Sequence, residues 1–349
     1  MAGVGDVLLQ LFLQFESGVV RCNSDAHDPL PKSCRQDTTQ RLWPNILPVC
    51  AAFSGLCLRL RLMDSIRVIG GNPISGEVAV HGAKNAVLKH MVAMLLAPGK
   101  YRLDNVPGIL DVDIMGEVLD HVGASCTRTG SVIDVEVPEK LNPEAPLDLV
   151  RRMRASILIL GALLARVGTA RVALPGGDDF GSRPIGMHVD GLEQMGAEFE
   201  LRHGVLNASA PDGLKGTEIF LEFPSVGATE NLLLAAVMAK GRTVIGNAAR
   251  EPELTDLAKL LNAMGANVQG AGTSNIEVVG VPELHPADHT VVADRLVAGT
   301  YALAAAATVG TIQVNGCNPD HLRMELRKME AAGCEVTRGE DWFALTGPE

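Results

Sequence analysis

Four polar or basic residues stand where apolar, helix-like runs of the sequence begin. They are Lys84, Arg154, Ser225 and Arg295. Backbone N–H groups at the start of a helix attract anions, and a Lys or Arg beside them can add hydrogen bonds to a phosphate or carboxylate. These residues predict a site for an anionic ligand, as in an enzyme with a phosphorylated substrate. Taken singly, each is also explained as a solvated cation or the cap of a buried helix, and Arg295 could pair with the adjacent Asp294.

A second group of candidates lies in the loop ALPGGDDFGSRPIGMH, residues 173–188. Its glycines and prolines make it too irregular for a simple connection between a strand and a helix. Asp178 or Asp179 could act there as an acid or a base, and Arg183 could hold an anion. The alternative is a turn in which an aspartate caps the next helix.

The elements that position these residues form a repeat. Glycines follow a helix-like segment at four points about 70 residues apart, namely Gly123, Gly196, Gly265 and Gly333. Each stands where a left-handed helix C-cap is expected and precedes an alternating, hairpin-like segment. Each repeat therefore reads as helix, strand, helix and hairpin, which predicts an α/β fold of repeated units. In a pseudo-symmetric domain the starts of the first helices converge on one end, which would be electropositive.

The composition limits the class of protein. The 349 residues are 47% hydrophobic and carry a net charge of −11, so the chain can bury large cores but is a poor candidate for nucleic-acid binding. Seven cysteines, without a CxxC pair, favour a reducing compartment such as the cytoplasm. The sequence has no apolar run of membrane-spanning length. Residues 1–62 follow no helix or strand pattern and are expected to add nothing to the fold, the alternative being an extension with its own role.

The motifs around these residues resemble those of the UDP-N-acetylglucosamine enolpyruvyl transferase family. The similar segments keep the family's order from Met63 to about Leu345 and include GAKNA, RRMRASILILGALLARVG, LPGGDDFGSRP, SVGATEN and ADRLVAGTYALAAAA. This family is grouped with 5-enolpyruvylshikimate-3-phosphate (EPSP) synthase, so the resemblance implies a pseudo-three-fold, inside-out α/β barrel. It implies a complete three-repeat domain at residues 84–293, and a partial second domain made of residues 63–83 and 294–349. Because the family has six repeats and this chain has four, a C-terminal truncation is expected.

The resemblance also implies a reaction and its residues. The family transfers the enolpyruvyl group of phosphoenolpyruvate to the 3′-hydroxyl of UDP-N-acetylglucosamine, the first committed step of peptidoglycan synthesis, without a metal or organic cofactor. The implied catalytic residue is Asp178, where the family usually has the cysteine that fosfomycin alkylates, so fosfomycin resistance is expected. Lys84 and Asn85 match the family's phosphoenolpyruvate-binding pair. The implied substrate-binding residues are Lys84, Asn85, Arg154, Arg183, Pro184, Ile185, Gly186, Met187, Ser225, Val226 and Gly227.

Two departures from the family pattern concern contacts to the substrate. Gly186 stands where many relatives have aspartate, and Pro224 stands where lysine is common. Two alternatives to the implied function are an enolpyruvyl transferase like EPSP synthase, and an inactive, truncated chain that binds a UDP-sugar. The expected partners are phosphoenolpyruvate and UDP-N-acetylglucosamine, with no nucleic acid and no membrane, and the oligomeric state is left open.

Overall fold

The computed structural model describes residues 70–145, 149–150, 153–174 and 185–348. Three groups of sequence predictions lie outside this part of the chain. They concern residues 1–62, the proposed catalytic residue Asp178, and the two substrate-binding positions Arg183 and Pro184.

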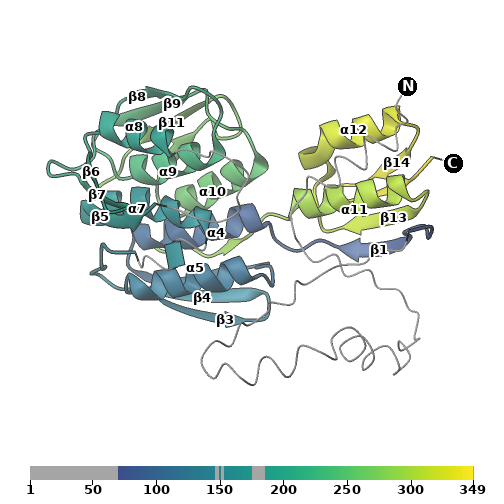
Figure 1. Cartoon of the computed structure of the whole chain (residues 1–349), viewed down its shortest axis with the longest axis horizontal. Coiled ribbons are helices and arrows are strands. Elements are labelled where there is room, and N and C mark those ends of the chain that lie inside the picture. The colour runs from purple at the N-terminus through teal and green to yellow at the C-terminus, as the bar shows by residue number, and fades with distance from the viewer. Residues whose placement is uncertain (1–69, 146–148, 151–152, 175–184, 349) are drawn as a thin grey trace, which may run out of the picture. The chain divides into compact units, whose positions relative to one another are not determined.

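The predicted repeat is confirmed, because the chain forms a helix, a strand, a second helix and a hairpin four times (Figure 1). The first repeat contains α4 (Lys84–Ala93), η1 (Met94–Leu96), β2 (Gly99–Asp104), α5 (Leu110–His121), β3 (Ser125–Thr129) and β4 (Val132–Val137). The second contains η2 (Arg154–Leu158), α7 (Ile159–Val167), β5 (Thr169–Ala173), α8 (Gly186–Gln194), β6 (Glu198–Arg202) and β7 (Val205–Ser209). The third contains α9 (Val226–Ala236), β9 (Arg242–Gly246), α10 (Pro252–Ala263), β10 (Asn267–Gln269) and β11 (Asn275–Val279). The fourth contains α11 (Arg295–Ala307), β13 (Thr311–Asn315), η3 (Pro319–Leu322), α12 (Arg323–Ala331), β14 (Glu335–Arg338) and β15 (Trp342–Thr346).

A glycine in the left-handed backbone region ends the second helix of each repeat. The φ angles are +108° at Gly123, +94° at Gly196, +98° at Gly265 and +99° at Gly333. A residue with a Cβ is strained at such angles, so glycine lets the chain leave the helix and enter the hairpin directly. The predicted C-caps are therefore confirmed at all four positions.

The sheets follow one plan and link the repeats to one another. In each repeat the first strand pairs antiparallel with the last strand of the hairpin, as β2 does with β4 and β9 with β11. A short segment from elsewhere then adds to the first strand in parallel. These additions are Glu144 beside Arg171 of β5, β8 (Glu218–Phe220) beside β9, β12 (His289–Thr290) beside β2, and β1 (Gly76–Ala79) beside β13.

The order of these additions closes the first three repeats into a ring. The segment after the first repeat joins the sheet of the second, and the segment after the second joins the sheet of the third. The segment after the third, β12, returns to the sheet of the first. The three sheets are thereby tied in a cycle, which is the pseudo-three-fold arrangement that the sequence predicts.

The first helices of these three repeats form the inside of the ring. On α4 every residue from Ala86 to Ala93 is buried, and on α9 every residue from Ala228 to Ala236 is buried. A helix that is buried all round must pack against other elements on every side, and α7 packs between β5 and α9. The sheets cover these helices from outside, so the fold is an inside-out α/β barrel, as predicted.

The fourth repeat has a hydrophobic core of its own. Val80, next to β1, packs with residues of α11 and with Phe343 of β15. On α11, Leu296 and Tyr301 remain more than a third exposed, in contrast to the buried residues of α9. The division of the chain into domains at residues 84–293 and at 63–83 with 294–349 stays a prediction. No helix in the described ranges is long and apolar enough to cross a membrane.

Candidate functional site

The four residues predicted to begin the first helices do so. Lys84 is the first residue of α4, Arg154 is the first of η2, and Arg295 is the first of α11. Ser225 is the N-cap of α9, and its side chain accepts a hydrogen bond from Ala228 N at 3.3 Å. All four residues therefore lie at helix starts, with Ser225 one position earlier than the other three. The Arg154 side chain lies outside the described part of the chain.

One carboxylate caps two of these helices. Asp294 Oδ1 accepts hydrogen bonds from Leu296 N at 2.9 Å and Val297 N at 3.0 Å, so it caps α11. Its Oδ2 accepts a hydrogen bond from Lys84 N at 3.1 Å, at the start of α4. Since Ala83 at the N-cap of α4 has no side chain that could accept such a bond, Asp294 supplies the cap from another repeat. This buried residue joins the fourth repeat to the first.

The ammonium group of Lys84 pairs with a second carboxylate. Lys84 Nζ lies 2.7 Å from Asp111 Oδ2, and the two side chains are 41% and 27% exposed. Asp111 lies in the first turn of α5, where the helix dipole favours an acidic residue. The neighbouring Asn85 is exposed, and its backbone oxygen accepts a hydrogen bond from Lys89 Nζ. An anionic ligand at Lys84 would have to compete with Asp111.

The alternative in which Arg295 pairs with the adjacent Asp294 is wrong. Arg295 Nε instead lies 3.1 Å and 3.3 Å from the two carboxylate oxygens of Glu253, in the first turn of α10. Adjacent residues at a helix start point in different directions, and the Asp294 carboxylate is already held by backbone donors. Glu253 is buried, so this pair is a structural link between the third and fourth repeats.

Six of the predicted substrate-binding residues lie at the starts of two neighbouring helices, α8 and α9. Ile185 is the N-cap of α8, and Gly186 and Met187 are its first residues. A Cβ at Gly186 would lie 3.8 Å from Asp190 Oδ2, an ordinary van der Waals contact, so the site has room for a Cβ. Val226 and Gly227 begin α9 and are partly buried.

A buried hydrogen-bond network brings these two helix starts together. A Cβ on Gly227 would lie 3.2 Å from the ring of His188 on α8, so glycine permits close contact between the two helices. His188 Nδ1 lies 3.0 Å from Asn231 Nδ2 on α9, and Asn231 Oδ1 accepts a hydrogen bond from Gly161 N of α7 at 2.8 Å. The starts of α8 and α9 are therefore fixed relative to α7.

A buried ion pair links α4, which begins with Lys84 and Asn85, to α9, which begins with Val226 and Gly227. Glu230 of α9 lies 3.5 Å from Lys89 Nζ of α4. Burial raises the pKa of Glu230 to about 7, although Lys89 opposes the rise. This carboxyl therefore changes its charge near neutral pH, deep between two of the inner helices.

Sequence reasoning missed the acidic partners at these helix starts. Asp111 and Glu253 both lie in the first turn of a second helix, which is a recognisable sequence position. Which cation each would meet depends on how the helices pack, within the first repeat for Asp111 and between repeats for Glu253, and that has no local signal. Asp178, Arg183 and Pro184 lie outside the described residues, so their relation to Lys84 stays a prediction.

Comparison with known proteins identifies the class. The family model of EPSP synthase (3-phosphoshikimate 1-carboxyvinyltransferase) matches residues 68–349, and the chain belongs to this family. The enolpyruvyl transferase NikO from Streptomyces tendae has a similar structure, with a TM-score of 0.71 and 25% identity over 80% of this chain and 67% of that one. An EPSP synthase from Acinetobacter baumannii, at 19% identity and a TM-score of 0.59 over 80% of this chain and 65% of its own, shares the fold.

Closer relatives in sequence carry one name. The UDP-N-acetylglucosamine 1-carboxyvinyltransferase of Mycobacterium tuberculosis is 52% identical over 279 residues, which are 80% of this chain and 66% of the relative. That of Corynebacterium jeikeium is 51% identical over 275 residues, which are 79% of this chain and 66% of the relative. The predicted resemblance is confirmed, and the chain spans about two thirds of the length of these curated relatives.

Proposed function

We propose that this chain takes part in transfer of the enolpyruvyl group from phosphoenolpyruvate to the 3′-hydroxyl of UDP-N-acetylglucosamine, a cytoplasmic reaction of peptidoglycan synthesis. The observation that carries the proposal is the 52% identity over 279 residues to 1-carboxyvinyltransferases for this sugar nucleotide. The family match, residues 68–349, contains all four helix starts at which an anion is expected.

The roles of the residues follow from their charge and position. Lys84 and Asn85, at the start of α4, would hold phosphoenolpyruvate, and Arg154 and Arg183 would add contacts to the anionic substrates. Lys84 would exchange its contact with Asp111 for a contact with the ligand. Cationic groups fixed in this way stabilise the charge on the reacting phosphate and carboxylate.

The remaining predicted residues would hold the sugar nucleotide. The first backbone N–H groups of a helix, as at the starts of α8 and α9, suit the diphosphate of UDP. The residues concerned are Pro184, Ile185, Gly186, Met187, Ser225, Val226 and Gly227.

The reaction would proceed by addition and elimination. A proton adds to carbon 3 of phosphoenolpyruvate, and the 3′-oxygen of the sugar, losing its proton, bonds to carbon 2. A proton then leaves carbon 3 as the bond from carbon 2 to the phosphate oxygen breaks, which restores the double bond and releases phosphate. Asp178 would supply the first proton as a general acid.

Phosphate release by the full chain in the presence of both substrates tests the proposal. Lys84→Met should lower the rate at least about 100-fold, as expected for removal of one charged group from the reacting phosphate. Lys100→Met is the matched control, because Lys100 Nζ is exposed and lies 3.7 Å from Glu136 on the outer strands β2 and β4. Equal rates for both variants would contradict the role of Lys84.

The choice of substrate separates the alternatives. Phosphate release with shikimate 3-phosphate in place of the sugar nucleotide would favour an EPSP synthase, whose family model matches the chain. Calorimetric binding of UDP-N-acetylglucosamine without phosphate release would favour a chain that binds the sugar and does not turn it over. Either result would overturn the proposed reaction.

A further inference from the structure

Three potential metal ligands meet where the ring of repeats closes. They are His90 of α4, Asp256 of α10 and His289 of β12. His90 Nε2 lies 3.4 Å from Asp256 Oδ2, and His289 Nε2 lies 3.1 Å from Asp256 Oδ1. The two imidazole rings are 4.7 Å apart at an interplanar angle of 62°. One ligand atom from each residue lies within 4.8 Å of the other two.

His90 is a buried imidazole without a hydrogen bond. Its side chain is fully buried, and neither ring nitrogen has a hydrogen-bond partner among the residues that the structure describes. Leaving such a group without a partner costs about 1–3 kcal/mol, which calls for an explanation at this position.

Asp256 provides the negative charge. Its Oδ2 accepts a hydrogen bond from Val292 N at 2.9 Å, and its Oδ1 lies 3.1 Å from His289 Nε2. A buried imidazole without a hydrogen bond therefore lies against one oxygen of a carboxylate, with a second imidazole on its other oxygen. Two imidazole nitrogens and one carboxylate oxygen are a set of ligands that binds Zn²⁺ and similar transition-metal ions.

We propose that His90, Asp256 and His289 bind one divalent transition-metal ion, of which Zn²⁺ is the expected case. Bonds of about 2.0–2.1 Å in a tetrahedron place neighbouring ligand atoms about 3.4 Å apart. The distances of 3.4 Å from His90 Nε2 to Asp256 Oδ2 and of 3.1 Å from His289 Nε2 to Asp256 Oδ1 are close to this spacing. Because each imidazole faces a different oxygen, the carboxylate must turn to present one oxygen to the ion. The ion would use the free lone pair of His90 and displace the proton shared by His289 and Asp256.

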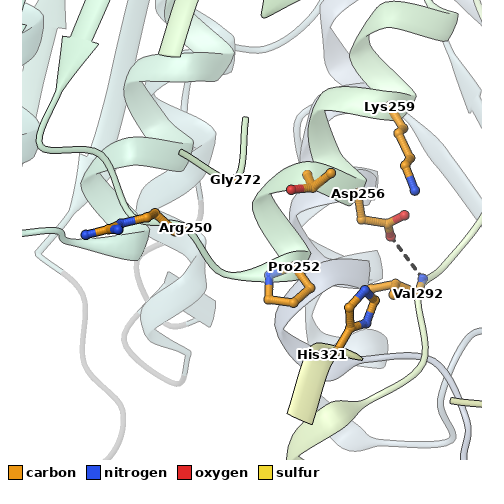
Figure 2. A pocket seen from close by; sticks show the side chains of 8 residues that line it. Arg250, Pro252, Asp256, Lys259, Gly272, Val292 and His321 are labelled. Carbon is orange, nitrogen blue, oxygen red and sulfur yellow. Dashed lines mark hydrogen bonds between the residues drawn. The ribbon is translucent and has the colours of Figure 1, made fainter. Parts of the chain in front are cut away.

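A pocket lies beside Asp256. The pocket has a volume of about 220 Å³ and is lined by Asp256, Lys259, Val292 and His321, among others. Figure 2 shows the Asp256 carboxylate on the wall of this pocket, where it accepts a hydrogen bond from Val292 N, with the side chains of Lys259 and His321 nearby.

The position of the ligands indicates a structural role. His90 belongs to the first repeat and Asp256 to the third, while His289 lies on the strand that returns from the third repeat to the sheet of the first. The ion would therefore bind the ring at the point where its last sheet pairing closes. His90 is six residues beyond Lys84, about 9 Å along α4, so the proposal does not depend on the proposed reaction.

Metal binding by the untagged full chain tests the proposal. After removal of metal with a chelator, titration with Zn²⁺ alone should give about one ion per chain and a Kd in the micromolar range or below. This affinity is modest for zinc, because His90 Nδ1 has no described partner that would orient the ring. At a hundredfold excess over Kd the Tm should rise by about 5 °C. Co²⁺ should give the intense visible absorption of a tetrahedral site.

Three variants connect the binding to these residues. His90→Leu and His289→Gln should each weaken Zn²⁺ binding at least about 10-fold. His285→Gln is the matched control, since this exposed histidine precedes His289 by four residues and should leave the affinity unchanged. If His90→Leu does not fold, His289→Gln at the edge of the cluster carries the test.

Two results would overturn the assignment. Wild-type protein that binds no stoichiometric ion would show that His90 is a packing residue. In that case a metal-free His90→Leu variant that is more stable than the metal-free wild type would support the same conclusion. Binding of equal strength in wild type, His90→Leu and His289→Gln would place the ion elsewhere, for instance on cysteines.

Discussion

Replacing Glu230 with glutamine should change how the stability of the fold depends on pH. Glu230 lies on α9 with 1% of its surface exposed, 3.5 Å from Lys89 Nζ on α4. Burial raises its pKa from 4.5 to about 7, Lys89 opposes the rise, and Glu253 and Glu251 add to it. The folded protein therefore keeps this carboxyl protonated at pH values at which the unfolded chain has already lost the proton.

The size of the effect follows from the difference in pKa. Because the folded state binds the extra proton between the two values, the contribution of Glu230 to the free energy of unfolding is highest below pH 4.5 and falls as the pH rises to about 7. At about 1.4 kcal/mol for each pKa unit, the loss amounts to about 3 kcal/mol, most of it between about pH 5 and about pH 8.

Glutamine has the shape of the protonated side chain and no charge. Near pH 5, Lys89 faces a neutral side chain in both proteins, so Glu230→Gln should be about as stable as wild type. Near pH 8 only the wild type has an ionised carboxyl in this position, so the variant should be more stable by about 2–3 kcal/mol.

Urea unfolding followed by circular dichroism at these two pH values measures the difference. Glu193→Gln is the matched control, because Glu193 is an exposed glutamate on α8 and its replacement should keep the pH dependence of the wild type. If Glu230→Gln also keeps that dependence, the buried carboxyl is ionised in the folded protein well below neutral pH, and the reasoning from burial is refuted.

Three further predictions concern a cap, a helix contact and the loop residue. Asp294→Ala removes the carboxylate that caps two helices and should cost about 2–3 kcal/mol in urea unfolding, whereas Asp294→Asn keeps an acceptor and should cost about 1 kcal/mol. Gly161→Ala should destabilise by more than about 2 kcal/mol because its Cβ would come 2.4 Å from oxygen atoms of α9. Gly116→Ala, with its nearest atom at 3.7 Å, should be neutral or stabilise by up to about 1 kcal/mol in the same assay. Fosfomycin should leave Asp178 unmodified, whereas Asp178→Cys should form an adduct visible by mass spectrometry, since a thiolate is the far better nucleophile toward an epoxide; an adduct on Asp178 itself would contradict this.

The repeat could be predicted from the sequence because its signals are local. A glycine after a helical run and an alternating hairpin each occupy a few residues, and their recurrence at four places outweighs the ambiguity of any one. The additions that close the ring could not be predicted. β12 has only two residues and Glu144 forms a single bridge, so neither has an alternation to detect.

In the candidate site, too, the features with a local sequence signal could be predicted and the contacts between distant residues could not. The starts of α4, η2, α9 and α11 were predicted correctly because a polar residue before an apolar run is a sequence pattern. The partner of Arg295 was not, since Glu253 is 42 residues away and becomes a neighbour only through the contact between repeats. The role of Asp178 rests on the resemblance alone and stays a prediction.

Carboxylates of the protein itself occupy places at which the sequence predicts an anionic ligand, and they differ in how readily a ligand can replace them. Asp294 and Glu253 are buried, so a ligand that displaced either would leave a charge without its partners in the interior, at a cost of about 3–5 kcal/mol. Asp111 is more than a quarter exposed, and a pair of this kind is worth about 1 kcal/mol or less. When a phosphate or carboxylate takes the ammonium group of Lys84, water can solvate Asp111 in its place. An incoming anion can therefore replace Asp111 at Lys84 while Asp294 still caps α4 and α11.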